Sequence, residues 1–416
     1  MINLYIFNET SRAAVYGIGT YIRELTTALQ GYNISICVIH LHSDKPENEL
    51  NESDTIQHWY IPAPVYWNAS LDLDRQNELY YRNVAYLLQL QIKDTENLVF
   101  HLNYIQCRPL SENLRRFFSC KIILTIHYLD WGFRLSGNTV RFRQILVVQE
   151  TDQADEFNKS IIESYRKEKE LFEMVDHIIC LSRNTQQILQ NDYWIKPDKT
   201  TVVYNGLTGG NSTLDKPALR KKYHIPDIPI ILFAGRLDDI KGLTCALQAF
   251  KTVLNTQQCH IMIAGNGSFD KYMKECEDIW MHVTWTGLIS KAKLYDLYSI
   301  ADIGIMPSFH EQCSYVAIEM MMHGVPIIAS TSTGLKEMVE DGIAGLHVPV
   351  EEYSDRAEID SSQLAEKILY LLQYPKERKR MGVNARKHYE AAYGVEIFRK
   401  NMLHLYESLF ISTGLP

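Results

Sequence analysis

Two glutamates that lie eight positions apart stand out in the stretch "FHEQCSYVAIEMMMHGVPIIAS", residues 309–330. Glu319 is the one charged residue in the apolar run from Tyr315 to Met322, and Glu311 precedes that run. A lone carboxylate on an apolar helix is costly to bury without a partner. Two roles suit Glu319 equally well: a structural ion pair with a lysine or arginine, or a hydrogen-bond acceptor for a vicinal diol such as ribose. Glu311 is then either a solvated loop residue or an acceptor for sugar hydroxyls.

The same stretch also predicts an anion site at the start of a helix. Ser314 is a typical N-cap residue, so the helix is expected to begin near Tyr315 and to end at His323, before a Gly-Val-Pro stop signal. The N–H groups of Ser314, Tyr315 and Val316 would then face a negatively charged group, because a helix start carries free donors and partial positive charge.

A second stretch, "ILFAGRLDDIKGLTCALQAF" at residues 231–250, has residue types that suit a diphosphate. Gly235 ends a buried strand, and a second glycine follows Lys241 and opens the next helix. Glycines let the backbone approach a ligand closely. Arg236 adds a two-pronged hydrogen-bond donor, and Lys241 adds a point charge. The alternative is a plain strand-turn-helix with two solvated cations.

Two glycines near the N-terminus, Gly17 and Gly19, precede an expected helix after the first strand "INLYIF". They do not complete the dinucleotide-binding fingerprint, because Ile22 stands where that pattern needs glycine or alanine. NAD binding is therefore not predicted, and the two glycines alone are a weak signal for any ligand.

A histidine, His127, is expected at the carboxyl end of the strand "KIILTI", which is the functional edge of a parallel sheet. His101 and Asn103 are weaker candidates at a neighbouring strand end. Most lone histidines are structural, but this position favours a functional role for His127.

Two further stretches have competing interpretations. The acidic "DLD" at residues 72–74 resembles a metal-binding pair, but it follows no strand and precedes a helix-like run, so a helix cap is preferred. The basic stretch 134–144 could touch a membrane surface or an acceptor, and a solvated loop is the preferred interpretation.

The elements that must position these residues alternate between short runs rich in Ile and Val and amphipathic helices. Strands are expected near 2–7, 34–40, 97–102, 120–126, 176–181, 200–204, 229–234, 259–264, 282–286, 302–306, 325–329 and 345–348. This alternation predicts an α/β protein with parallel sheets covered on both faces, in which ligands bind beyond the carboxyl ends of the strands.

A join rich in Gly, Asn and Thr at residues 205–217 divides the chain into two doubly wound, Rossmann-like domains. The expected bounds are 1–208 for the first domain, 209–394 for the second, and 395–416 for a final amphipathic helix with no strand after it. Two such domains that face each other would form a cleft.

The composition excludes several classes of protein. With 416 residues, 46% hydrophobic and 22% charged residues and a net charge of -8, the chain has material for large cores and no overall attraction to nucleic acid. No apolar run approaches the roughly 18–20 residues that span a bilayer, and the first residues predict a strand rather than a signal peptide. The eight cysteines include no CxxC pair, which favours reduced thiols and predicts a cytoplasmic protein with at most peripheral membrane contact.

Three stretches together resemble a known family. "FAGRLDDIKG", "MPSFHEQCSYVAIEMMMHGVPIIAS" and "GLKEMVEDGIAGLHV" are similar to the second domain of GT-B glycosyltransferases of glycosyltransferase family four, and the spacing of Glu311 and Glu319 is a hallmark of that family. "VVYNGL" resembles its interdomain segment, and the N-terminal glycine loop and "TIHYLD" resemble its first domain. The resemblance implies a GT-B fold with the acceptor on the first domain, the donor on the second, and a C-terminal helix that crosses back onto the first.

The resemblance also implies a role for each candidate residue. Arg236 and Lys241 would hold the donor diphosphate. Glu319 would bind the ribose, and Glu311 would bind hydroxyls of the transferred sugar. His127 would approach that sugar from the first domain. Further donor contacts would come from turns near the phosphates and from residues near the base, namely Gly17, Gly19, Gly235, Ser314, Tyr315, Val316, Leu288 and Ile289.

The implied function is a retaining glycosyltransferase that moves a sugar from a nucleotide diphosphate sugar, by default a UDP-sugar, to an acceptor hydroxyl without a metal or other cofactor. The alternatives are a GT-B nucleotide-sugar epimerase and a non-catalytic nucleotide-sugar-binding partner subunit. The acceptor is open among a glycan, a lipid-linked sugar, a peptide and a small molecule. The donor sugar is open too, because the family often has Gly-Phe-Gly where this chain has Gln312, Cys313 and Ser314.

Overall fold

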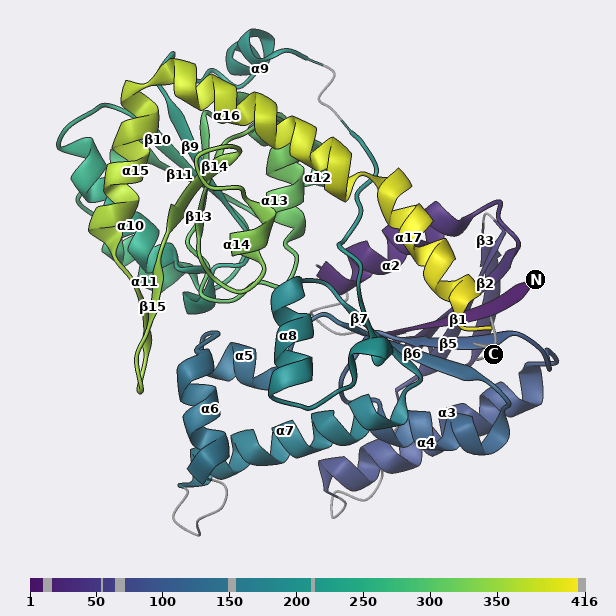
Figure 1. The fold of residues 1–416 in the computed structure, drawn as a ribbon. Coiled ribbons are helices and arrows are strands. Elements are labelled where there is room, and N and C mark those ends of the chain that lie inside the picture. The colour runs from purple at the N-terminus through teal and green to yellow at the C-terminus, as the bar shows by residue number, and fades with distance from the viewer. Residues whose placement is uncertain (10–16, 54, 64–71, 149–154, 211–213, 411–416) are drawn as a thin grey trace, which may run out of the picture. The chain divides into compact units, whose positions relative to one another are not determined.

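The structure, a computed structural model, describes residues 1–9, 17–53, 55–63, 72–148, 155–210 and 214–410. The chain forms two compact units, which are described separately (Figure 1). Unit 1 comprises Met1–Asp130, Thr151–Gly206 and Val395–Pro416, and unit 2 comprises Trp131–Glu150 and Leu207–Gly394. Each unit is a parallel sheet with helices packed against it, which confirms the predicted α/β class.

Unit 1 is built on an eight-stranded sheet in the order β3-β4-β2-β1-β5-β6-β7-β8. Its strands are β1 (Ile2–Glu9), β2 (Ile34–Ser43), β3 (Glu49–Ser53), β4 (Ile56–Pro62), β5 (Leu98–Leu102), β6 (Lys121–Ile126), β7 (His177–Cys180) and β8 (Thr200–Val202). Neighbouring strands are parallel except for the antiparallel pair of β3 and β4. The six strands predicted for this half are confirmed, and β3 and β4 are additional.

The helices of unit 1 cover this sheet. They are α2 (Gly17–Leu29), α3 (Leu73–Gln91), α4 (Arg108–Phe117), α7 (Glu156–Met174), α8 (Arg183–Asn191) and α17 (Val395–Ser408), with a short turn at Pro197–Lys199. The C-terminal α17 packs against α2, and its Arg399 donates from Nε to the carbonyl oxygen of Ala28 over 2.7 Å. The "DLD" stretch is a helix cap, as preferred, because Asp72 accepts a 2.7 Å hydrogen bond from the backbone N–H of Arg75.

Unit 2 is built on a six-stranded parallel sheet in the order β11-β10-β9-β12-β13-β14. Its strands are β9 (Ile230–Ala234), β10 (His260–Ala264), β11 (Val283–Gly287), β12 (Ile303–Met306), β13 (Ile327–Ser330) and β14 (Gly345–Val348). All six were predictable from their apolar runs. A separate antiparallel hairpin, which the sequence did not predict, joins β15 (Val350–Glu352) to β16 (Ala357–Ile359).

Helices cover both faces of the second sheet (Figure 1). The helices of unit 2 are α5 (Asp130–Arg134, whose first residue belongs to unit 1), α6 (Thr139–Val148), α9 (Lys216–Lys222), α10 (Leu243–Leu254), α11 (Phe269–Glu275), α12 (Lys291–Ile300), α13 (Tyr315–Met322), α14 (Leu335–Met338), α15 (Ser361–Gln373) and α16 (Pro375–His388), with short turns at Asp239–Lys241, Trp280–His282 and Tyr389–Tyr393. Ile303 and Ile305 of β12 join the core beneath α10 and α15, whereas Gly304 lies against Met320 of α13. Alternate residues of β12 therefore pack against helices on opposite sides of the sheet, so both faces of this parallel sheet are buried.

The segment 131–150 corrects two expectations. The sequence places it in the first domain and treats its basic part, 134–144, as a solvated loop, but the segment forms α5 and α6 within unit 2. Glu352 of the hairpin accepts hydrogen bonds at the start of α6, from Thr139 Oγ1 at 2.6 Å and from the backbone N–H of Val140 at 3.0 Å. A carboxylate at a helix start accepts hydrogen bonds from the free N–H groups there, and its negative charge interacts favourably with the positive end of the helix dipole.

One buried carboxylate gives unit 1 a pH-dependent stability. Glu168 of α7 accepts hydrogen bonds from the backbone N–H of Asp130 at 2.8 Å and from the hydroxyl of Tyr193. Burial raises the pKa of its carboxyl to about 7. Because this folded-state pKa is above the ordinary value, folding favours the protonated form. The contribution of protonated Glu168 to the free energy of unfolding is fully present below the ordinary pKa of a glutamate. It is lost as the pH rises through about 7.

We therefore expect Glu168→Gln to flatten the fall in stability between pH 4.5 and 7, by about 3 kcal/mol in total. Urea unfolding at several pH values, performed on wild type and variant, measures this difference. Glu163→Gln is the matched control, because Glu163 lies on the same helix with an exposed carboxylate. Equal pH slopes in wild type and Glu168→Gln would contradict the assignment.

Candidate functional site

The candidate donor site of unit 2 lies where the strand order reverses. From β9 the chain proceeds outward through β10 and β11, and then returns to the other side of β9 with β12, β13 and β14. Ligands of open α/β sheets bind at the carboxyl edge beside such a reversal. The turn after β9 carries Gly235, Arg236 and Lys241, and the turn after β12 carries Glu311. These residues, predicted from two separate stretches, therefore meet at one sheet edge.

Lys241 and Glu311 are ion-paired. Nζ of Lys241 donates to Oε1 of Glu311 over 2.5 Å, and the two side chains are only 17% and 13% exposed. The hydroxyl of Ser308 lies 3.4 Å from the same carboxylate oxygen. The sequence assigned these two residues to different parts of a ligand and did not predict their pairing. Both charged groups are therefore largely shielded from water, and each holds the other in position.

Arg236 is oriented by two neighbours that the sequence did not identify. Its guanidinium lies 3.2 Å from a carboxylate oxygen of Asp238 and 5.9 Å from the centre of the Phe133 ring. Phe133 belongs to α5, so the segment 131–150 reaches the turn after β9 in its own unit. A planar guanidinium held by a carboxylate and an aromatic ring loses less freedom when it binds an anion.

The two glycines of this turn are there for different reasons. Gly235 has φ 144° and Gly242 has φ 69°, which both lie in the region that favours glycine. A Cβ at Gly242 would also lie 1.9 Å from the carbonyl oxygen of Pro307, whereas a Cβ at Gly235 would meet nothing within 4 Å. Gly242 therefore allows the turns after β9 and β12 to touch, and Gly235 leaves open space beside Arg236.

The backbone of Glu311 is fixed by a third loop that the sequence did not implicate. Its N–H donates to Oγ1 of Thr333 over 3.0 Å, and its carbonyl oxygen accepts from the N–H of Gly334 over 2.7 Å. A Cβ at Gly334 would lie 1.7 Å from the carbonyl oxygen of Gln312. Glycine at 334 is thus a steric requirement for the position of the Glu311 loop.

Glu319 lies on α13 and is buried, with 7% exposure. The hydroxyl of Tyr298 donates to Oε2 over 3.0 Å, and Nζ of Lys291 lies 3.8 Å from Oε1. Burial, followed by the charge of Glu319, raises the pKa of Tyr298 well above its usual range. Of the two roles expected for Glu319, the structural ion pair is present only weakly, because Lys291 lies near the limit of ion-pair distance. The geometry is also compatible with the second role, in which Glu319 accepts hydrogen bonds from a diol.

The start of α13 differs from its prediction. Ser314 occupies the N-cap position, but its hydroxyl makes no capping hydrogen bond. Its N–H points to Sδ of Met338 at 3.2 Å, so it is not directed at an anion. Tyr315 and Val316 are the first two residues of the helix, as expected.

The residues proposed to lie near the base sit further along the same edge. Leu288 is exposed and Ile289 is half-buried, and both follow β11, which is two strands from β9. Gly287 before them has φ 64°, which turns the chain at the end of the strand.

The candidate residues of unit 1 form a second group at the carboxyl edge of its own sheet. Nε2 of His127 lies 2.9 Å from Oδ1 of Asn103, and the His127 ring makes an edge contact with Tyr21 at 4.8 Å. Burial lowers the pKa of His127 to about 3, so its imidazole is neutral at pH 7. Gly17 and Gly19 do not precede α2 but form its first turn.

The family models cover most of the chain. Residues 15–208 match the model described as Glycosyltransferase Family 4, and residues 215–388 match Glycosyl transferases group 1. The chain belongs to glycosyltransferase family 4. The motifs from which the sequence predicted this family, between 231 and 348, fall within the second match.

Relatives of this family 4 chain are distant. Alpha-D-kanosaminyltransferase of Streptomyces kanamyceticus is 26% identical over 46% of the chain and 48% of its own length, and the chain spans about half the length of such curated relatives. Sucrose-phosphate synthase from Thermosynechococcus elongatus has a similar structure, with a TM-score of 0.77 and 22% identity over 99% of this chain and 100% of that one. Anabaena HepE in complex with UDP-glucose gives a TM-score of 0.68 and 13% identity over 98% and 100%. These similarities show a GT-B fold.

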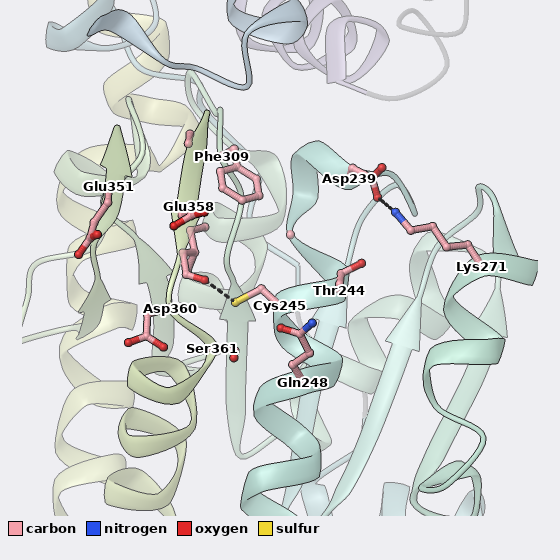
Figure 2. Close-up of a pocket in the computed structure, with 13 residues that line it drawn as sticks. Asp239, Thr244, Cys245, Gln248, Lys271, Phe309, Glu351, Glu358, Asp360 and Ser361 are labelled. Atoms are coloured by element: carbon pink, nitrogen blue, oxygen red, sulfur yellow. Dashed lines mark hydrogen bonds and ion pairs between the residues drawn. The ribbon is translucent and has the colours of Figure 1, made fainter. Parts of the chain in front are cut away.

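A pocket of about 690 Å³ in unit 2 of the family 4 chain is distinct from the predicted donor residues (Figure 2). Figure 2 shows Asp239 paired with Lys271 at one side of it and Glu351, Glu358 and Asp360 at the other. None of the predicted site residues lines it. Asp239 and Phe309 belong to the same two turns as Lys241 and Glu311, so the pocket lies next to those turns.

The described part of this family 4 chain shows neither a metal-binding cluster nor a membrane-spanning helix. Within the described ranges, no group of three or more His, Cys, Asp or Glu side chains could hold a metal ion. No helix in the described part of the chain is both long enough and apolar enough to cross a bilayer.

Proposed function

We propose that this family 4 protein transfers a sugar, with retention of configuration, from a nucleotide diphosphate sugar to a hydroxyl group of an acceptor. The observation that carries the proposal is the grouping of Arg236, Lys241 and Glu311 at the β9–β12 edge, with Glu319 on the helix that follows. Two cations, one sugar-facing carboxylate and one diol-facing carboxylate match the chemical parts of such a donor.

Departure of the diphosphate is the step that these residues assist. Negative charge grows on the leaving phosphate while positive charge grows at the anomeric carbon. Lys241 and Arg236 stabilise the phosphate charge from fixed positions, so little reorganisation is needed during the reaction. In the donor complex, Nζ of Lys241 turns toward the phosphate and the carboxylate of Glu311 accepts from sugar hydroxyls.

The acceptor hydroxyl attacks the same face that the diphosphate leaves. A bond forms between the acceptor oxygen and the anomeric carbon, the bond from that carbon to the phosphate oxygen breaks, and the acceptor proton passes to the departing phosphate. No side chain is required as a covalent nucleophile. His127 of unit 1 is neutral at pH 7, so its imidazole can both donate and accept a hydrogen bond.

A uridine diphosphate sugar is the first donor to test, a choice supported by the Anabaena protein of similar fold that was solved with UDP-glucose. We expect one nucleotide among UDP, GDP, ADP and dTDP, offered free and as sugar conjugates, to raise the Tm in a thermal-shift screen. The corresponding donor should then be hydrolysed slowly with nucleotide release, both with and without EDTA.

Four outcomes contradict this proposal in different ways. The absence of any nucleotide-dependent rise in Tm argues against the donor site itself. Binding without donor consumption favours the non-catalytic subunit, and donor consumption that yields an isomeric sugar favours the epimerase. A strict requirement for a divalent metal contradicts the mechanism, because Arg236 and Lys241 would then not suffice.

A further inference from the structure

A polar cluster around Glu9, at the carboxyl edge of unit 1, is not used by the proposed donor chemistry. Strand order in this sheet reverses at β1, which has β2 on one side and β5 on the other. The last residue of β1 is Glu9, which is half-buried. Its place beside the reversal is where an open α/β sheet binds a ligand.

Glu9 is held from two sides by tyrosines. Tyr81 of α3, 2% exposed, donates its hydroxyl to Oε1 of Glu9 over 2.7 Å. Tyr104, which follows β5 and is also 2% exposed, lies with its hydroxyl 3.1 Å from Oδ1 of Asn8 and 3.3 Å from the carbonyl oxygen of Glu9. A carboxylate fixed in this way keeps a defined direction without a cation.

The neighbours of Glu9 are polar but uncharged. Tyr128, after β6, donates its hydroxyl to Oε1 of Gln106 over 3.0 Å and is close enough to Glu9 to feel its charge. Asn103 lies beside Tyr104 and contacts His127, which burial keeps neutral. Burial also raises the pKa of Glu9. Among these described neighbours there is no lysine or arginine to receive a phosphate or a carboxylate.

We propose that Glu9, oriented by Tyr81, accepts a hydrogen bond from a hydroxyl of an uncharged carbohydrate acceptor that enters over β1 and β5. Amide groups, tyrosine hydroxyls and one carboxylate supply acceptors and donors for a sugar, and the half-buried ring of Tyr128 supplies flat apolar surface. A phosphorylated or acidic acceptor end would meet the charge of Glu9, and the described neighbours named above include no cation to compensate it. This inference rests on the proposed transferase function and names the acceptor class for it.

The test compares sugars of different charge with the donor selected by the thermal-shift screen. The neutral probes are the methyl glycosides of glucose, galactose, mannose and N-acetylglucosamine, and the charged probes are the acidic sugars glucose 6-phosphate and glucuronic acid. Product is detected by mass spectrometry, and rates follow nucleotide release. We expect at least one neutral glycoside to be used, and each charged sugar to be used less well than its neutral counterpart.

Glu9→Gln should raise the KM for the neutral acceptor by roughly 10- to 100-fold, because a hydrogen bond to a charged group is lost. Donor hydrolysis without acceptor should stay within about twofold of wild type, because Glu9 does not touch the donor. Tyr81→Phe, which keeps the ring but frees the carboxylate, should shift the acceptor KM in the same direction by a smaller factor. Glu96→Gln is the matched control, an exposed carboxylate just before β5 at the opposite end of the sheet.

Each result decides between the two proposals. If the donor is not consumed at all, the transferase function fails, and this inference fails with it. If the donor is consumed but the acceptor KM is unchanged in Glu9→Gln, only the role of Glu9 is overturned. If no neutral glycoside is used, or if charged sugars are preferred, only the acceptor class is overturned.

Discussion

Lys241→Ala lowers kcat for sugar transfer by about 100- to 1,000-fold, and Arg236→Ala has an effect of similar size. Each variant removes one of the two cations at the β9–β12 edge that we propose to stabilise the departing diphosphate. Loss of a single preorganised group of this kind raises a barrier by roughly 3 to 4 kcal/mol. The KM for the donor should change less than kcat, because the phosphate charge is larger in the transition state than in the ground state.

The measurement needs a control for local damage, because Lys241 is ion-paired with Glu311 over 2.5 Å. Lys271→Ala is suited to this purpose, since Lys271 is exposed and pairs with Asp239 in the same turn as Lys241. That control should keep kcat within about twofold of wild type. Unchanged kcat in both Arg236→Ala and Lys241→Ala would contradict the diphosphate assignment, provided that the Tm shows both variants to be folded.

Gly334→Ala is expected to lower kcat/KM at least tenfold and to lower the Tm, although residue 334 is not predicted to contact the donor. An added Cβ would lie 1.7 Å from the carbonyl oxygen of Gln312 and 2.9 Å from that of Glu311. The φ of Gly334 is -78°, which alanine adopts without strain, so the effect is steric. A backbone clash of this kind costs roughly 1 to 3 kcal/mol, and a shift of about 1 Å in a sugar-binding carboxylate is enough to reduce the rate 100-fold.

The matched control for this variant is Gly209→Ala in the same unit. A Cβ there would have the hydroxyl of Tyr389 as its nearest neighbour at 3.6 Å, an ordinary contact. Steady-state kinetics with the donor and thermal unfolding should therefore separate Gly334→Ala from Gly209→Ala. Equal activity of the two variants would show that the Glu311 loop tolerates displacement.

Most of the fold could be predicted from the sequence, because a parallel strand buried on both faces leaves an apolar run in the chain. Strands β9, β10, β12 and β13 are of this kind, whereas the edge strand β11 has no buried residue. The strands that the sequence did not predict do not contain such an apolar run. β3 is polar and exposed at a sheet edge, and β15 and β16 are three residues each, with two glutamates in β15 and one in β16. Their pairing depends on the neighbouring strand and not on their own apolar content.

The residue types of the candidate site, and the sheet edge on which they lie, could be predicted from the sequence, but the contacts among these residues could not. Glycine, arginine, lysine and glutamate after apolar strands identify the edge at which a ligand binds, as Arg236 and Glu311 illustrate. The pairing of Lys241 with Glu311, and the dependence of the Glu311 loop on Thr333 and Gly334, arise from contacts between segments 22 to 70 residues apart. No local pattern encodes such contacts. The direction of the Ser314 N–H toward Met338 is a further case.

The placement of residues 131–150 in unit 2 has a consequence for synthesis on the ribosome. Asn138 donates from Nδ2 to the carbonyl oxygens of Tyr353 and Arg356, which lie 215 and 218 residues later in the chain. At ordinary translation rates the segment emerges roughly 10 to 40 s before the hairpin that receives it. During that interval Trp131 can stack on Phe142 of the same segment, but the contacts of α5 with His310 and of α6 with the hairpin are missing. Nascent chains that end before residue 350 should therefore be the stage at which a chaperone is needed.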